Sequence, residues 1–352
     1  MGTWDKRVKR ICVGALITAA LLRAAGSGSL AAMGRRGAEL LQDRNFAAFL
    51  LYLQTGRRIP ASCLAVEMEP ETTTVPPTED TEPETEPVQE TEPAARFEMG
   101  PRRAFTPEEG ESVEIKYSGD YRPDLGELIA RPTGLDFSGE EPRVLIISTH
   151  ATEAYAMEPG WEYTPSALAR TTDTDYNVIR VGRELAEVLR QGGVSVIQDT
   201  TLNDYPSYTG SYNQARSRIQ DLLEEYPTIQ MVIDVHRDAV EDEAGNQLGT
   251  AREVLGQDSA QVMLVMGTDE GGMDHPDWEE NLSWALKIQR TLDEEAPGLA
   301  RPLNLRIERF NEDLTPGSCL LEVGTAGDTL QEALTAVRLF GQGLLQAMAD
   351  LG

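Results

Sequence analysis

The stretch at 143–149, RVLIIST, is a continuous apolar run that follows a proline and ends in polar residues. This length and composition predict a β-strand that is buried on both faces, as in a parallel sheet. Similar apolar runs occur further along, IQMVIDV at 229–235 and CLLEV at 319–323. Because parallel strands need crossover connections, the spacing predicts an α/β fold.

The segments between these strands carry helical patterns. Residues 177–191 place Val178, Val181 and Leu185 on one helical face, and a Gly-Gly pair follows as a stop signal. Further predicted elements are strands at 194–197 and 261–266 and helices at 212–225, 279–292 and 329–348. The alternation predicts a three-layer sandwich with a mainly parallel central sheet, whose ligand site lies beyond the carboxyl ends of the strands.

The N-terminus has the pattern of a targeting segment. Four cations lie within the first ten residues, and the apolar run ICVGALITAALL follows at 11–22. We interpret residues 1–33 as a signal-like segment or membrane anchor, and the sequence leaves open whether it is cleaved. The basic flank predicts that everything after it lies outside the cytoplasm, tethered to the membrane or, after cleavage, secreted.

Two further segments precede the globular part. Residues 34–66 include leucine and aromatic side chains at helical spacing, which predicts a juxtamembrane helix. Residues 67–103 are rich in Thr, Glu and Pro, and a stretch of this kind predicts a disordered, charge-extended linker. Ordinary composition returns after it, so we expect one catalytic domain over 104–352.

Charge and cysteine content exclude several classes of protein. The formal net charge of -28 argues against a nucleic-acid partner, which would need clustered Lys and Arg. The three cysteines (Cys12, Cys63 and Cys319) are isolated and lack the paired spacing of disulfide frameworks or zinc fingers.

Two of the three histidines follow predicted buried strands. His150 lies in STHATEAY and His236 in DVHRDA, where the fold predicts a site. Catalytic zinc is commonly held by two imidazoles and one carboxylate, with a position left open for water. Glu153, three residues after His150, is the first choice for the third ligand, and another carboxylate remains an alternative. The pattern predicts a Zn²⁺ site.

Glu322 follows an apolar run in CLLEVG, so its carboxylate needs a partner. Next to an activated water it would be the general base. The alternative is a salt bridge to an arginine such as Arg237, Arg301 or Arg306. Burial of this glutamate therefore predicts either catalysis or an ion pair.

Further polar residues are candidates for supporting roles. Arg237 and Asp238 could contact substrate, and Asp234 could accept a hydrogen bond from an imidazole. His275, in the loop GGMDHPDW, is expected to face solvent or substrate rather than bind metal. A polar-aromatic stretch is expected to pack as a loop and helix start, with a substrate groove as the alternative; its members are Tyr205, Tyr208, Tyr212, Arg216 and Arg218.

Several motifs occur together in the order found in the stage II sporulation protein P family, and the chain resembles that family over about residues 118–348. The motifs are HATEAY, NVIRVG, DYPSYTGSYNQARSRI, IDVHRDA, DWEENL and LLEVGTAGDTLQEA. The resemblance maps His150 and Glu153 onto the family's HTHTTESY-type motif, and Glu322 onto its catalytic position. The motif DIHRDA maps onto residues 234–239. Ser148 stands where the family usually has a further histidine, and Gly327-Asp328 stands near its usual Asn-Thr.

The resemblance implies an amidase-like fold and a zinc-dependent N-acetylmuramoyl-L-alanine amidase. Such an enzyme cuts peptidoglycan between the glycan lactyl group and the stem peptide during engulfment, with peptide crosslinks as a second implied target. Implied partners are the transglycosylase stage II sporulation protein D and other engulfment proteins. From the residues alone, a zinc carboxypeptidase-like peptidase and a degenerate septal scaffold remain alternatives.

Overall fold

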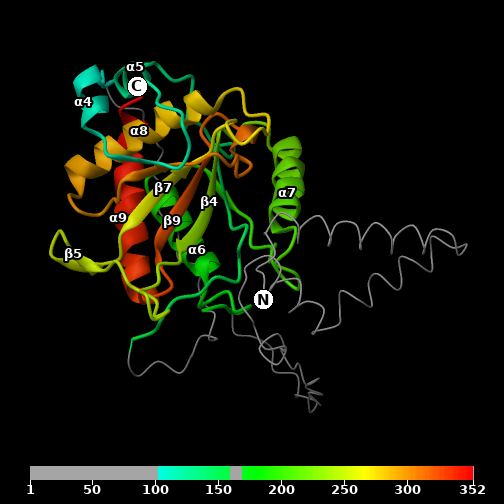
Figure 1. Ribbon diagram of the computed structural model, residues 1–352. Coiled ribbons are helices and arrows are strands. Elements are labelled where there is room, and N and C mark those ends of the chain that lie inside the picture. Colours follow the sequence, from blue (N-terminus) through cyan, green and yellow to red (C-terminus); the bar gives the residue numbers. More distant parts are fainter. Residues whose placement is uncertain (1–101, 159–168, 352) are drawn as a thin grey trace, which may run out of the picture. The chain divides into compact units, whose positions relative to one another are not determined.

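The computed structural model describes residues 102–158 and 169–351, which belong to the unit Val88–Gly352 (Figure 1). The predicted segment 1–33, the predicted helix 34–66 and the predicted linker up to residue 101 lie outside the described residues. No helix in the described ranges is both long and apolar enough to cross a membrane.

A seven-stranded sheet forms the centre of the described part, in the order β1-β8-β7-β9-β4-β2-β3. All neighbouring strands are parallel except β7 and β9, which are antiparallel. The strands are β1 (Ile115–Tyr117), β2 (Val144–Ile147), β3 (Val196–Gln198), β4 (Met231–Asp238), β7 (Val262–Met266), β8 (Leu303–Leu305) and β9 (Cys319–Thr325). A separate hairpin joins β5 (Arg252–Val254) to β6 (Gln257–Ser259). The mainly parallel sheet is confirmed.

Helices cover the two faces of the sheet unequally. The large core includes side chains of α6 (Val178–Gln191), α8 (Trp278–Glu295) and α9 (Leu330–Ala349). The short helices α4 (Pro107–Ser112) and α5 (Leu125–Ala130) join the same layer by packing on α8. On the opposite face, α7 (Ser211–Glu225) packs on β2 and β4 (Figure 1). The three-layer prediction holds, and α7 supplies the thin layer.

A third, small apolar cluster lies on the α7 side of the sheet, over β7 and β9. It consists of Met263, Val265 and Leu320, with Phe310 packed against them. Strand alternation places these three strand residues on the same face as Asp234 and His236 of β4. No helix residue in the described ranges belongs to this cluster. This part of the sheet face is therefore available as the floor of a site.

The predicted helix at 177–191 is confirmed as α6. Asn177 begins it by accepting a hydrogen bond from the Ile179 backbone N–H. Its buried residues include Val181, Leu185 and Leu189, as the 3.6-residue spacing predicts. The turn that ends it contains Gly193 at φ +87, a conformation that favours glycine.

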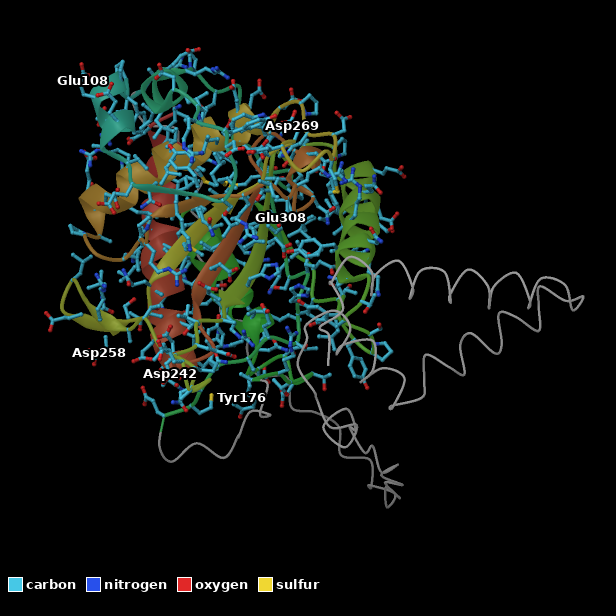
Figure 2. The ribbon with its side chains drawn as sticks, in the orientation of Figure 1. Glu108, Tyr176, Asp242, Asp258, Asp269 and Glu308 are labelled. Atoms are coloured by element: carbon cyan, nitrogen blue, oxygen red, sulfur yellow. The ribbon has the colours of Figure 1, made fainter. Side chains whose placement is uncertain are left out.

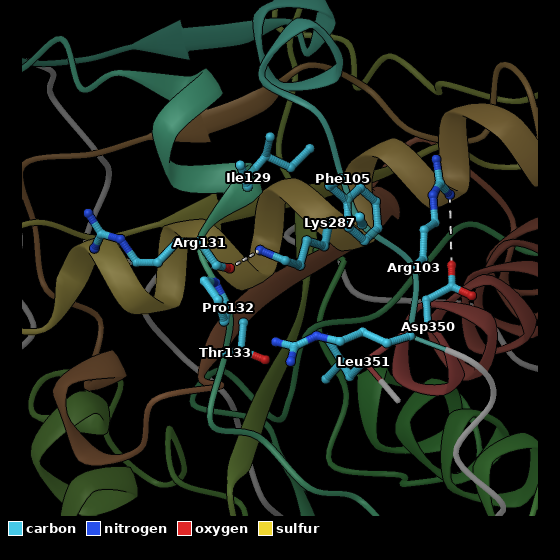
Figure 3. Close-up of a pocket in the computed structure, with 12 residues that line it drawn as sticks. Arg103, Phe105, Ile129, Arg131, Pro132, Thr133, Lys287, Asp350 and Leu351 are labelled. Carbon is cyan, nitrogen blue, oxygen red and sulfur yellow. Dashed lines mark hydrogen bonds and ion pairs between the residues drawn. The ribbon is translucent and has the colours of Figure 1, made fainter.

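A buried lysine lies in the layer formed by α5 and α8. The Lys287 side chain is only 5% exposed, and its ammonium donates to the Arg131 carbonyl at 2.9 Å (Figure 3). It also donates to the Ser283 hydroxyl at 3.1 Å. Burial, together with the nearby Arg131 and Arg102, lowers the Lys287 pKa to about 8.

This lysine predicts a pH-dependent stability. Because its pKa is lower in the folded protein, the unfolded chain binds more protons between pH about 8 and about 10.5, so folding gains stability as the pH rises. Relative to Lys287→Met, the free energy of unfolding of the parent should rise by about 2 kcal/mol between about pH 7.5 and about pH 10. Denaturant titrations at both pH values measure it, and a constant difference would contradict it.

Candidate metal and catalytic site

Six of the seven predicted site residues line one cavity of about 440 Å³, and Asp234 is the exception. His150, Glu153, His236 and Glu322 line it, together with Arg237 and Asp238. The residues come from the turn after β2, from β4 and from β9. Ser148, the departure from the family pattern, does not line this cavity.

His236 lies inside β4, so the prediction that it directly follows a strand is wrong. The strand continues to Asp238 because it still pairs with β9, with His236 opposite Glu322 and a register shift before Asp238. The imidazole is 3% exposed; its Nδ1 is 3.4 Å from Glu153 Oε2, and its Nε2 is 3.0 Å from Asp234 Oδ1. Burial disfavours its charge, but the carboxylates of Asp234 and Glu153 outweigh burial and raise the His236 pKa.

Asp234 takes the position predicted for a residue that orients an imidazole. Besides its contact with His236, it accepts hydrogen bonds from the Thr149 backbone N–H at 2.7 Å and from the Thr149 hydroxyl at 2.6 Å. Among the described residues, the Nε2 atom of His236 has no hydrogen bond of good geometry, so its 3.0 Å contact with Asp234 is mainly electrostatic. Asp234 thus ties β4 to the turn that carries His150.

His150 lies on the turn after β2, as predicted. The Tyr208 hydroxyl is 3.0 Å from its Nε2, and the Ser211 hydroxyl is 3.3 Å from its Nδ1. Its ring stacks on Tyr208 and meets the ring of His236 edge-on at 5.2 Å between centroids. Burial and the charge of His236 lower the His150 pKa to about 4, so the imidazole is neutral at physiological pH.

Glu153 is ionised despite its burial. The HATE segment closes a turn in which the Glu153 N–H donates to the His150 carbonyl at 3.0 Å. Its carboxylate accepts from the Arg237 backbone N–H at 3.3 Å and lies 3.4 Å from an Arg170 nitrogen. Burial opposes the charge, but the hydrogen bond and charge of His236 outweigh it and lower the Glu153 pKa to about 2.

Glu322 lies in the middle of β9 rather than at its end, on the cavity face. Its Oε2 atom is buried and has no hydrogen-bond partner in the described part of the chain. Burial raises the Glu322 pKa to about 8. The arginines considered as salt-bridge partners bind elsewhere. Arg301 pairs with Asp238, and Arg237 donates to the carbonyls of Ala154 and Ala169. Arg306 pairs with Glu308, the residue labelled near the centre of Figure 2.

The imidazoles of His150 and His236 and the carboxylate of Glu153 are suitable ligands for a zinc ion, but the three side chains do not converge on one point. Within residues 102–158 and 169–351, no three His, Cys, Asp or Glu side chains are placed together as metal ligands. Glu153 and His236 are adjacent, whereas His150 faces two hydroxyl groups. Zinc requires neutral imidazoles and an ionised carboxylate. His150 and Glu153 already have these forms, so His150 would have to exchange a hydroxyl partner for the metal, whereas His236, whose pKa is raised, would have to release a proton when zinc binds.

Several neighbours of the site were not predicted. Arg170 lines the cavity, contacts Glu153, pairs with Asp204 at 2.7 Å and lies over the Tyr208 ring. Asp204 also accepts from the backbone and hydroxyl of Thr152. No sequence signal identifies this cluster, because its members are joined by tertiary contacts alone.

Some residues of the polar-aromatic stretch line the cavity, as a substrate groove would require, and others pack as part of a loop and helix. Tyr208 and Tyr212 line the cavity. Arg216 pairs instead with Asp313, and Arg218 pairs with Asp199, so these two arginines belong to the packing of α7. Tyr205 is exposed and does not line the cavity.

The expectation that His275 faces solvent or substrate is wrong. Its side chain is 0% exposed and does not line the cavity. It lies in the loop between β7 and α8, and burial lowers its pKa.

Asp234 gives a testable prediction for metal binding. Asp234→Asn removes the charge beside His236 and should weaken zinc binding by about 10- to 100-fold, because residues that orient a metal ligand have effects of this size. Competition with a zinc chelator measures the affinity. Asp199→Asn is the matched control, since Asp199 is also buried and bonded but contacts Arg218. Equal affinities in the parent and Asp234→Asn would contradict the role.

Comparison with known proteins gives matches in both sequence and structure. A family profile described as Stage II sporulation protein P matches residues 56–344. The stage II sporulation protein P of Bacillus subtilis (strain 168) is 27% identical over 206 residues, which are 55% of this chain and 48% of that protein. The match thus spans about half the length of that relative.

Among solved structures, the CwlD amidase of Clostridioides difficile in complex with the GerS lipoprotein shares 13% identity at a TM-score of 0.35, over 59% of this chain and 98% of that one. The N-acetylmuramyl-L-alanine amidase Ami1 of Mycobacterium smegmatis shares 11% identity at a TM-score of 0.35, over 61% and 98%. The amidase AmiC2 of Nostoc punctiforme shares 13% identity at a TM-score of 0.34, over 60% and 97%.

Proposed function

The chain belongs to the stage II sporulation protein P family, and on that premise we propose that it is a zinc-dependent peptidoglycan hydrolase. The bond cut is the amide between N-acetylmuramic acid and the L-Ala of the stem peptide. The single observation that carries this proposal is the Oε2 atom of Glu322, which is buried and has no hydrogen-bond partner among the described residues, in a cavity that also contains two imidazoles and a second carboxylate.

The metal ligands in this proposal are His150, Glu153 and His236. Two imidazoles and one carboxylate form a common catalytic zinc set. Asp234 holds His236 from the side opposite Glu153, which supports the orientation of the imidazole. A bound zinc ion would supply a Lewis acid that polarises the scissile carbonyl and acidifies a water molecule.

Glu322 is the general base in this scheme. Glu322 is paired with His236 in the sheet and lines the same cavity, which supports a role for its carboxylate beside the proposed ligands. Burial alone would keep much of Glu322 protonated near neutral pH, and the positive charge of a neighbouring zinc ion would favour its ionised form. In that form Glu322 accepts a proton from the attacking water and then donates that proton to the leaving amine of the stem peptide. Because Oε2 has no protein partner in the described ranges, no internal hydrogen bond has to break first.

Cellular placement is part of the proposal. The cationic N-terminus and the apolar run at 11–22 support a membrane-anchored protein whose catalytic domain lies outside the cytoplasm. Family membership supports action during sporulation and engulfment, with the transglycosylase stage II sporulation protein D and other engulfment proteins as partners. Cleavage of peptide crosslinks is a second proposed activity.

Analysis of the products tests the function. The purified full chain is incubated with zinc and isolated sacculi, and soluble products are identified by mass spectrometry. Stem peptides with a free L-Ala amine are expected. If the products were cut only within the peptide, the chain would be a carboxypeptidase-like peptidase rather than an amidase. If no soluble products were released, the scaffold alternative would be favoured.

A further inference from the structure

The cavity continues beyond the catalytic residues over the part of the sheet that no described helix covers. We propose that this uncovered face of β9, β7, β8 and β1 binds the peptide part of the substrate, and that Lys116 binds a free carboxylate of that peptide. The inference rests on the proposed function and adds to it the residue that recognises the peptide's charge.

The register of the strands sets the direction of this groove. Leu320 of β9 is opposite Val265 of β7, Val265 is opposite Asn304 of β8, and Asn304 is opposite Lys116 of β1. All four residues line the same cavity as Glu322. A continuous row of side chains therefore leads from the catalytic strand to the edge of the sheet.

The length of this row matches a short peptide. Neighbouring strands are about 4.8 Å apart, so three steps from β9 to β1 span about 14 Å. An extended chain covers about 3.3 to 3.6 Å per residue, so about four residues span the row from Leu320 to Lys116. Glu322 lies two residues beyond Leu320 on β9, about 7 Å along the strand. A peptide whose first amide nitrogen lies at Glu322 would place its third or fourth residue at Lys116.

The floor and rim have suitable chemistry. Met263, Val265, Leu320 and Phe310 form an apolar floor, which suits small side chains such as the methyl group of alanine. The rim carries positive charge although the whole chain has a net charge of -28. A cationic rim on an acidic protein favours an anionic ligand.

Lys116 carries the available charge at this rim. Arg301 is 2.5 Å from Asp238, and Arg306 pairs with Glu308 at 3.1 Å. Lys116 is exposed, and no ion pair or hydrogen bond of its side chain occurs among the described residues. Its ammonium can therefore bind a ligand carboxylate without first losing a protein partner.

Two matched muropeptides test the inference. One is a disaccharide-tetrapeptide with free carboxylates, and the other has the carboxylates of residues three and four converted to amides. The parent should cleave the free-acid substrate with a kcat/KM about tenfold higher. Lys116→Gln should lower kcat/KM for that substrate about tenfold, mainly through KM, and leave the amidated substrate unchanged.

Arg252→Gln is the matched control, because it removes one exposed cation on the β5–β6 hairpin outside the cavity. It should keep the parent's preference. Equal effects of Lys116→Gln on both substrates, or no effect on either, would overturn the role of Lys116.

Peptide binding separates this inference from the proposed function. Binding of the free-acid tetrapeptide to the Glu322→Gln full chain is measured by calorimetry, with and without Lys116→Gln. Weaker peptide binding by the variant with Lys116→Gln would support the groove, whether or not the parent cleaves the substrates. If the parent cleaved neither substrate, that result would contradict only the proposed hydrolase activity. Unchanged affinity overturns the groove even if the parent is an active amidase.

Discussion

The Glu322→Gln protein is expected to release muropeptides from sacculi about 10²- to 10⁴-fold more slowly than the parent, the usual contribution of a general acid-base group. Glutamine has nearly the same shape but cannot accept the proton of the attacking water. Zinc stoichiometry should not change, because Glu322 is not one of the proposed ligands. The metal-free variant should be at least as stable as the parent, since it no longer buries a carboxylate oxygen without a partner.

Glu312→Gln is the matched control for this prediction. Glu312 is also a buried glutamate, but its oxygens accept hydrogen bonds from the backbone N–H groups of Gly267 at 2.7 Å and Leu320 at 3.1 Å. An amide group opposite one of these donors should cost about 1 to 3 kcal/mol of stability and leave the turnover of folded protein unchanged. Turnover by Glu322→Gln at the parent's rate would exclude Glu322 as the base.

His236→Ala is expected to lose stoichiometric zinc and activity, and also to destabilise the metal-free protein by about 3 to 5 kcal/mol. The reason for the stability loss is that Asp234 and Glu153 flank the imidazole in a buried site, at 3.0 Å and 3.4 Å. Removing the cation leaves two buried carboxylates without the imidazolium that contacts both of them. Metal analysis and denaturant titration measure the two effects separately.

His150→Ala gives the contrasting result. Its imidazole is neutral and contacts only the hydroxyl groups of Tyr208 and Ser211 through its nitrogens. We expect the same loss of zinc and activity, with a stability cost of only about 1 kcal/mol. A similar stability loss in both alanine variants would contradict the assignment of the buried charge to His236.

The central strands could be predicted because they are buried on both faces and therefore read as continuous apolar runs. The residues at which these strands end could not be predicted. His236, Arg237 and Asp238 are polar residues at the end of β4, and a sequence pattern cannot distinguish such positions from the residues after a strand. They belong to the strand because β4 still pairs with β9 at these residues.

Short strands at the far end of the sheet left no sequence signal. β1 and β8 have three residues each, and the exposed Lys116 interrupts the apolar pattern of β1. The antiparallel pairing of β7 with β9 depends on tertiary contacts. The groove proposed here depends on both features, so it became visible only in the structure.

The candidate site was predictable to the extent that its residues lie next to the strands. His150, Glu153, His236 and Glu322 were identified from these positions, and all four line one cavity. The hydroxyl partners of His150 come from a loop and a helix about 60 residues away in the chain. No local pattern predicts such contacts.

Zinc stoichiometry tests the central claim most directly. The purified full chain, its His150→Ala variant and its Glu322→Gln variant are equilibrated with zinc, freed of excess metal and analysed by atomic spectroscopy. The account predicts one zinc ion per chain in the parent and in Glu322→Gln, and less than stoichiometric zinc in His150→Ala. A zinc-free parent, or equal zinc in His150→Ala and the parent, would contradict a catalytic metal held by His150, Glu153 and His236.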